Sequence, residues 1–368
     1  MAAPERQRGD GGVPRDGPPV SAPAVDPEDV IGYDALWESM ERCRRGVTWK
    51  GSVARFVMDA PYEIARLCDE LHDGTYRPRE PHRFVVTSPK RRDILGIPFR
   101  DRVVQRSYND NLLYPLMSRS WIYDNYACQE GKGTDFARRR MRCHLERHFR
   151  RHGLAGAILC LDVRGYYGHM RHDAIEANLS RKVPGWGVRH AMEVIRMQGG
   201  DGMGIVAGSQ TSQVVGVDYL DRMDHYVKER LGVRGYGRYM DDAILIHEDA
   251  ALLEAAIPEI QAMLADVGLA LHPDKTKVIP VWQRFGFLGF DFELTGTGRV
   301  RMSLKGESVG RMRRRVKRLA RLEREGLREP GTSDAAYGGW RAHALKGCSH
   351  SLIERCDEWY LRQKGFTC

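Results

Sequence analysis

Three aspartates beside short apolar segments have the residue type and placement to hold divalent cations. Asp241 and Asp242 are adjacent in "GYGRYMDDAILIHED", between residues typical of strands, and Asp162 ends the apolar run "AILCLD". If these strands are neighbours in one sheet, the three carboxylates converge where one strand ends and the facing hairpin turns. Magnesium prefers such oxygen ligands, and paired ions neutralise the charge that develops in phosphoryl and nucleotidyl transfer.

The doubled aspartate alone is explained equally well by a turn. Adjacent aspartates are common there, because their side chains hydrogen-bond to the backbone nearby. The order of the motifs is more specific than the pair: "LDVRGYYGHM" comes first, "GSQTSQ" follows, and "YMDD" comes last. This combination favours a catalytic role for Asp162, Asp241 and Asp242.

The elements that must position these residues form an α+β pattern. Residues 1–28 are rich in Pro, Gly and Ala without periodicity, which predicts a disordered tail. Helical periodicity follows, with a helix predicted at 60–72, and is interrupted at 83–99 by a predicted hairpin with the basic tip "SPKRRD". Strands alternate with helices between 155 and 295, which indicates an α+β or α/β lobe. From about 302 the chain reads as helical and basic.

The overall composition predicts a polyanionic partner. The 368 residues carry a formal net charge of +9, with 29% charged and 42% hydrophobic residues. Such an excess favours nucleic acid, although a basic protein without such a partner is the alternative. We expect no membrane-spanning helix, because the chain has no apolar run of about 18 residues. The N-terminal stretch lacks the apolar core of a signal peptide, so we expect a cytoplasmic protein.

The motifs together resemble those of reverse transcriptases from bacterial retroelements. The palm of that family carries an Asp-bearing strand with an aromatic pair, followed by "YMDD" on a hairpin. "RDILGIPFRDRVVQRSYNDNLLYPLMS" and "DNYACQEGKGTDFA" are similar to its fingers motifs, including those of group II intron enzymes. "ALHPDKTKV" and "GFLGFDF" are similar to its lysine motif and primer-grip hairpin. "YGGWRAHALKGCSHSLIERCDEWY" is similar to the thumb of diversity-generating retroelement enzymes.

The resemblance implies a right-hand polymerase. The expected division is fingers of helices and a hairpin at 29–154, an RRM-like antiparallel-sheet palm at 155–298 and a helical thumb at 299–368. The implied cofactor is two Mg²⁺ ions, for which Mn²⁺ can substitute. The implied catalytic residues are the three metal-binding aspartates and a candidate general acid, Lys275, whose alternative is a surface lysine before a strand.

The resemblance also implies binding residues. Tyr167, five residues after Asp162, matches the aromatic gate that excludes a ribose 2′-hydroxyl, although an ordinary packed ring is the alternative. Further residues match deoxynucleotide-binding positions, namely Lys90, Arg92, Ala207, Gly208 and Gln213. A last group matches positions that contact the template and primer, namely Gly289, Arg311, Arg314, Arg315 and Arg318. Solvated surface charge is the alternative for these arginines and for the fingers tip.

The loop "AGSQTSQ" distinguishes branches of the family. Group II intron enzymes typically have Gln where this chain has Ala207, and Pro where it has Gln213. The Gly-x-x-x-Ser-Gln ending resembles diversity-generating enzymes, although Ala207 is smaller than their usual aliphatic residue. Several phage-defence reverse transcriptases have also diverged here. Loss of the glutamine removes a restraint on the incoming nucleotide, which predicts low fidelity.

The sequence therefore predicts a bacterial RNA-directed DNA polymerase that copies a dedicated template RNA into cDNA. Its expected partners are template or non-coding RNA, deoxynucleoside triphosphates, and a small basic accessory protein or host factors. Three alternatives stay open: an antiphage-defence reverse transcriptase with a non-coding RNA, a template-independent polymerase, and a non-catalytic maturase-like RNA scaffold.

Overall fold

The computed structural model describes residues 25–86, 92–198, 200–206 and 208–364. The chain divides into two compact units. Unit 1 comprises Met1–Arg119 and Arg171–Asp218, and unit 2 comprises Ser120–Met170 and Tyr219–Cys368. The predicted tail at 1–28 and the hairpin tip "SPKRRD" lie mostly outside the described residues, and the division into fingers, palm and thumb stays a prediction.

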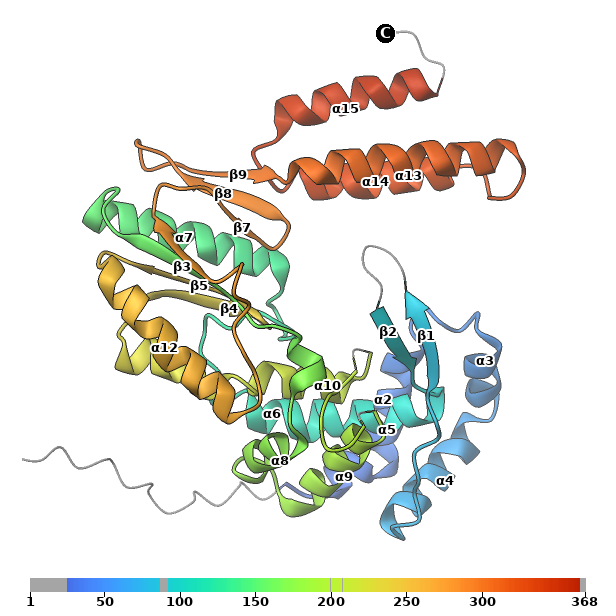
Figure 1. The fold of residues 1–368 in the computed structure, drawn as a ribbon. Coiled ribbons are helices and arrows are strands. Elements are labelled where there is room, and N and C mark those ends of the chain that lie inside the picture. Colours follow the sequence, from blue (N-terminus) through green and yellow to red (C-terminus); the bar gives the residue numbers. More distant parts are fainter. Residues whose placement is uncertain (1–24, 87–91, 199, 207, 365–368) are drawn as a thin grey trace, which may run out of the picture. The chain divides into compact units, whose positions relative to one another are not determined.

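Unit 1 is mainly helical and carries one hairpin (Figure 1). The predicted hairpin is present, and its strands pair antiparallel from His82 opposite Gly96 to Val86 opposite Arg92. The predicted helix at 60–72 begins with Pro61 in its first turn, where a missing N–H costs nothing. The elements of this unit are α1 (Glu28–Ile31), α2 (Tyr33–Arg44), α3 (Gly51–Met58), α4 (Ala60–His72), β1 (His82–Val86), β2 (Arg92–Gly96), α5 (Phe99–Tyr108), η1 (Asn109–Leu113), α6 (Tyr114–Met117), α8 (His172–Ser180), α9 (Gly185–Arg196) and α10 (Gln210–Asp218).

Unit 2 is built on two antiparallel sheets. The first has the strand order β4-β5-β3-β6 and the second the order β7-β8-β9. The elements of this unit are α7 (Thr134–His152), β3 (Ala157–Asp162), η2 (Tyr166–His169), α11 (Asp221–His225), η3 (Tyr226–Arg230), β4 (Gly235–Tyr239), β5 (Asp242–His247), α12 (Ala250–Asp266), β6 (Lys277–Pro280), β7 (Phe285–Phe287), β8 (Phe290–Leu294), β9 (Val300–Leu304), α13 (Gly306–Arg324), α14 (Thr332–Ala344) and α15 (His350–Gln363).

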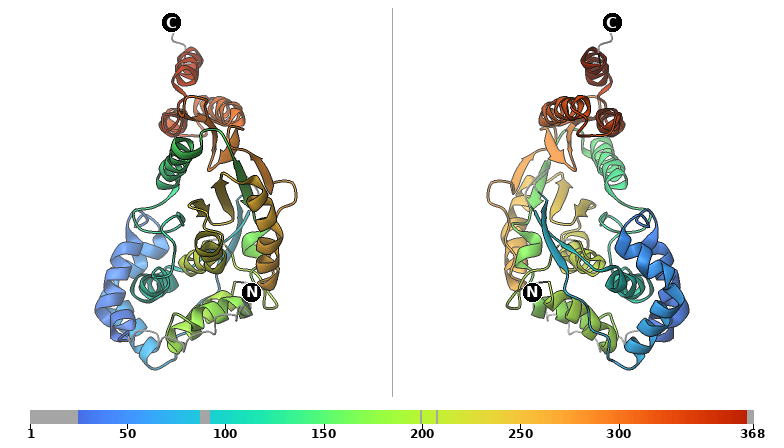
Figure 2. Two further views of the ribbon diagram at one scale, coloured as in Figure 1. Left: turned by 90° about the vertical axis from the view of Figure 1, so that its left-hand side faces the viewer. Right: turned by 90° about the vertical axis from the view of Figure 1, so that its right-hand side faces the viewer.

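Helices cover both faces of the first sheet. Alternate strand residues such as Ile158 and Ile244 join a buried cluster with Met141 and Leu145 of α7. The residues between them, including Leu159, point to the other face, and α12 packs against the same strands. Figures 1 and 2 place α7 and α12 on opposite sides of the strands. The central strands are therefore buried on both faces, as the apolar run "AILCLD" predicts.

The expected α+β fold class with antiparallel sheets is confirmed, but one strand was not predicted. The basic helix begins at Gly306, and β9 occupies the preceding residues and pairs with β8. Val300 and Leu304 are buried at alternate positions, a pattern too short to stand out beside a basic helix. Among the described residues, no helix combines the length and the apolarity that crossing a bilayer requires.

We predict that Gly237→Ala destabilises the first sheet. An added Cβ would lie 2.5 Å from Cζ of Tyr126, a ring with no exposed surface and no room to move. The expected loss is about 1–3 kcal/mol of unfolding free energy, measured by urea denaturation. Gly338→Ala is the matched control, because its Cβ would meet nothing within 4 Å on α14. The control should gain up to about 1 kcal/mol, and equal losses in both variants would contradict the steric explanation.

Candidate active site

The three aspartates lie together at one end of the first sheet of unit 2. Asp162, the last residue of β3, is directly opposite Asp242, the first residue of β5. Asp241 is in the two-residue turn between Tyr239 and Asp242, which are themselves paired. The N–H of Val163 donates to the carbonyl of Asp241 at 3.0 Å and so ties β3 to this turn. The sheet order thus brings together the residues that the sequence separates.

The turn that carries Asp241 has an unusual backbone. Met240 has a φ of +55°, and it is the only one of the two turn residues with a positive φ. A two-residue hairpin of this kind has a left-handed first position that is normally glycine. A methionine there costs of the order of 1–3 kcal/mol unless its surroundings hold it. The turn below the aspartates is therefore held by other contacts.

A buried ion pair supplies the strongest of these contacts. Arg238 and Asp224 have no exposed side-chain surface, and their guanidinium and carboxylate form two parallel bonds of 2.7 Å. The remaining guanidinium nitrogen, Nη1, donates to the carbonyl of Met240 at 2.9 Å. Burial lowers the pKa of Arg238, but the charge and hydrogen bonds of Asp224 outweigh it and raise that pKa overall. Arg238 therefore stays charged and holds the turn through its hydrogen bond to the carbonyl of Met240.

The carboxylates at the turn repel one another. The pKa of Asp242 is raised to about 7, chiefly by burial and further by the negative charges of Asp241 and Asp162. The charges of Lys305 and Lys275 act in the opposite direction. All four charges therefore lie close enough to Asp242 to influence its ionisation.

The two lysines differ in how the sequence signals them. Lys275 is half-exposed, and its Nζ contacts both oxygens of Asp162 at 2.9 and 3.0 Å. Lys305 directly precedes α13, and no local pattern connects it with Asp242. Sequence reasoning therefore found Lys275 through its motif and missed Lys305.

The donor set fits divalent cations. All the acidic groups are carboxylates, the ligand class that magnesium prefers, and two of them face each other across adjacent strands. Within the described part of the chain, no group of three or more His, Cys, Asp or Glu side chains is placed so that it could hold a metal ion. Lys275 engages both oxygens of Asp162, so binding of a cation at that carboxylate requires Lys275 to move away.

The predicted gate residue lies beside the turn. Tyr167 is in the 3₁₀ turn η2, and its hydroxyl is 3.7 Å from the sulfur of Met240. Its neighbour Tyr166 is buried in the core, whereas Tyr167 is half-buried. Of the aromatic pair, Tyr167 thus combines partial exposure with contact to the turn that carries Asp241.

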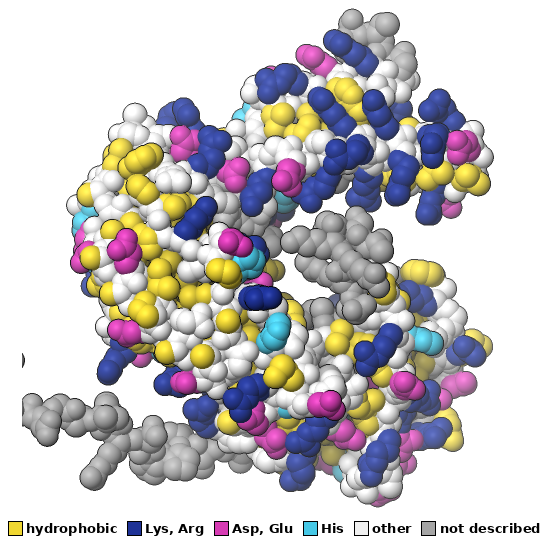
Figure 3. All heavy atoms as spheres, viewed as in Figure 1, with side chains coloured by type: hydrophobic (Ala, Val, Ile, Leu, Met, Phe, Trp, Pro, Cys, Tyr) yellow, Lys and Arg dark blue, Asp and Glu magenta, His cyan; other side chains and the backbone are white. Residues whose placement is uncertain are grey.

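The predicted template contacts of unit 2 are on the second sheet and on α13. Leu288 and Gly289 both have positive φ and form the two-residue turn between Phe287 and Phe290. Met312, Val316 and Leu319 of α13 are buried. The predicted arginines are all exposed on the rest of the helix, namely Arg311, Arg314, Arg315 and Arg318. Figure 3 shows basic side chains gathered over this helix.

Several predicted nucleotide contacts belong to unit 1. Lys90 and Ala207 lie outside the described residues, and Arg92 begins β2. An added Cβ at Gly208 would lie 2.8 Å from the carbonyl of Leu95, so this close approach of the loop to β2 requires glycine. Gln213 is exposed on the first turns of α10.

The loop motif also holds a buried polar network that sequence reasoning missed. Ser209 donates to Gln105 at 3.0 Å, and Ser212 donates to Gln198 at 2.7 Å. Thr211 accepts from Asn109 at 3.2 Å. The hydroxyl side chains of the "GSQTSQ" motif therefore point into the protein, where these hydrogen bonds hold them.

We predict that Asp224→Asn strongly destabilises unit 2. The substitution leaves the guanidinium of Arg238 buried without a counter-charge, at a cost of about 3–5 kcal/mol. Urea denaturation measures the change. Asp357→Asn is the matched control, because its partner Arg341 is 44% exposed, and such a pair contributes about 1 kcal/mol or less. Comparable losses of unfolding free energy in the two variants would show that the buried pair stabilises the protein no more than the exposed pair does.

Comparison with known proteins places the chain in a family. The family model described as "Reverse transcriptase (RNA-dependent DNA polymerase)" matches residues 88–292, more than half of the chain. No curated protein sequence gives a significant match.

Similar solved structures include three telomerases. A Candida albicans telomerase in complex with a fragment of telomeric RNA has a TM-score of 0.46 and 11% identity, over 64% of this chain and 50% of that chain. A Candida tropicalis apo telomerase truncated at its C-terminal domain has a TM-score of 0.46 and 12% identity, over 62% and 56%. The apo Candida tropicalis telomerase has a TM-score of 0.44 and 12% identity, over 58% and 46%. The chain thus spans about half of the length of these telomerases. From the match over residues 88–292, the chain belongs to the reverse transcriptase family.

Proposed function

We propose that the chain is an RNA-directed DNA polymerase that copies a template RNA into cDNA. One observation carries the proposal: Asp162 faces Asp242 across adjacent strands, with Asp241 in the strained turn between β4 and β5, in a member of the reverse transcriptase family. Nucleotidyl transfer needs positioning and charge neutralisation more than covalent chemistry from the protein. Carboxylates held at fixed backbone positions meet this requirement.

The aspartates are the proposed ligands of two Mg²⁺ ions, for which Mn²⁺ can substitute. When bound, these ions would stabilise the charge on the attacking and leaving oxygens. The chain's own residues would orient the reactants. Tyr167 would lie under the sugar and exclude a 2′-hydroxyl, and Lys275 would donate a proton to the leaving pyrophosphate. The contact between Lys275 and Asp162 supports this role, because it places the ammonium beside a proposed metal ligand, from which it would move when a cation binds.

The remaining proposed contacts are with nucleotide and nucleic acid. Lys90 and Arg92 would bind the triphosphate, Arg92 with both oxygens of a phosphate. Gly208 and Gln213 would border the nucleotide, as in related enzymes. The exposed arginines of α13 and the hairpin turn at Gly289 would follow the template–primer backbone, independently of sequence.

We predict that Asp241→Asn abolishes DNA synthesis and leaves RNA affinity unchanged. The amide keeps the shape of the turn but loses the charge that holds a cation, which should lower the rate by about 10³-fold or more. Primer extension on an RNA template measures synthesis, and fluorescence anisotropy measures RNA binding. Asp266→Asn, an exposed carboxylate of α12, is the control and should keep full activity. Synthesis that persists in Asp241→Asn would overturn the assignment and favour the RNA-scaffold alternative.

At a finer level, we propose a bacterial retroelement enzyme of the diversity-generating type with low fidelity. The "AGSQTSQ" loop and the thumb sequence support it. Such an enzyme would use a dedicated template RNA and a small basic accessory protein or host factors. An antiphage-defence enzyme with a non-coding RNA has the same chemistry, so the RNA that copurifies with the protein distinguishes the two.

We predict that Ala207→Gln raises fidelity. A glutamine restores one hydrogen bond near the incoming nucleotide, worth about 1 kcal/mol, or about a fivefold fall in misincorporation. Sequencing of extension products measures the error rate. Ala255→Gln makes the same change at an exposed position of α12 and should leave the error rate as in the parent. An unchanged error rate in Ala207→Gln would remove the fidelity hypothesis.

A further inference from the structure

A pocket of about 440 Å³ opens in unit 2 between α7 and the ends of β4 and β5. One of its lining residues, His247, is at the opposite end of β5 from Asp242. Five residue steps separate them, which corresponds to about 17 Å. The pocket is therefore distinct from the site formed by the aspartates.

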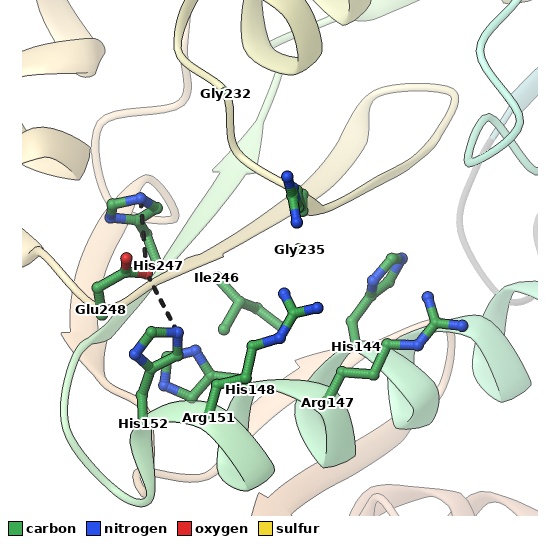
Figure 4. A pocket seen from close by; sticks show the side chains of 11 residues that line it. His144, Arg147, His148, Arg151, His152, Gly232, Gly235, Ile246, His247 and Glu248 are labelled. Carbon is green, nitrogen blue, oxygen red and sulfur yellow. Dashed lines mark ion pairs between the residues drawn. The ribbon is translucent and has the colours of Figure 1, made fainter.

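One face of α7 lines the pocket with ionisable side chains only. His144, Arg147, His148 and Arg151 recur at three- and four-residue steps, so they occupy a single helical face. Figure 4 shows Arg147 and Arg151 extending from α7 toward the hairpin strands. Arg234, from the loop before β4, completes a set of three arginines around the cavity.

These three arginines lack carboxylate partners. All are exposed, and none of their guanidiniums forms an ion pair with any other residue that the structure describes. The one acidic lining residue, Glu248, is shared by two histidines, at 3.7 Å from His152 and 3.6 Å from His247. The pocket thus gathers positive charge that the protein itself does not neutralise.

We propose that this pocket binds phosphate groups of an RNA backbone. Guanidiniums pair with phosphate oxygens through two parallel hydrogen bonds. Arg147 and Arg151 are one helical turn apart, about 5–6 Å, which is close to the spacing of successive phosphates along a strand. Among the described residues, the lining is mostly arginine and histidine, and Ile246 is its one aliphatic side chain, so the walls suit the charge of a sugar–phosphate chain.

The number of arginines favours a polymer over a small phosphate compound. Arg147, Arg151 and Arg234 can each pair with a separate phosphate, and a nucleic-acid strand presents several phosphates in succession. The inference deepens the proposed function, because it supplies an anchor for RNA away from the catalytic turn.

The test compares two variants that change the net charge of the pocket in opposite directions. The double variant Arg147→Gln/Arg151→Gln should weaken binding of a labelled RNA hairpin with single-stranded flanks on the order of tenfold at low salt. The slope of log affinity against log KCl concentration should fall by about 1.4, at about 0.7 for each lost phosphate contact. Glu248→Gln should tighten binding, an effect that misfolding does not produce.

Arg45→Gln/Arg55→Gln, which removes two exposed charges outside the pocket, is the matched control. Equal losses in the two double variants would overturn the inference, as would an unchanged slope. Loss of affinity for inorganic phosphate without loss of RNA affinity would assign the pocket to a small phosphate compound and overturn it too. Binding is measured without nucleotides or metal, so absence of DNA synthesis would contradict the proposed function and leave this inference standing.

Discussion

The buried ion pair between Arg238 and Asp224 is the interaction on which the aspartate site depends. Hydrogen bonds fix the guanidinium on one side to a carboxylate and on the other to the carbonyl of Met240. A turn with a left-handed methionine would otherwise relax toward a less strained backbone. The ion pair therefore holds the turn in its strained conformation. The position of Asp241 depends on that turn.

The sheet supplies the second constraint. Asp162 can face Asp242 only if β3 and β5 keep their register, since a slip of one residue would turn every side chain to the other face. Apolar residues on both faces of these strands fix that register, because α7 and α12 cover them. At its other end, β5 finishes beside the α7 pocket, together with the start of β4. One rigid sheet thus carries two charged sites of opposite sign.

Much of this could be predicted from sequence, because local patterns encode it. The apolar run before Asp162, the strand–turn–strand around Asp241 and the helix at 60–72 all have periodicities that the structure keeps. The features that could not be predicted from the sequence depend on contacts between residues that are distant along the chain. Asp224 lies in a helical segment with no motif, Lys305 is far from Asp242 in the sequence although its charge lowers the pKa of that carboxyl, and β9 is defined by its pairing with β8. The α7 pocket is of the same kind, since it needs the helix and the hairpin together.

The most direct test of the central claim is to sequence the DNA that the purified protein makes from a defined RNA template with Mg²⁺ and the four deoxynucleoside triphosphates. We expect DNA complementary to that template, with ribonucleotides excluded. DNA whose sequence does not depend on the template, or no DNA from a folded protein that binds the RNA, would contradict it.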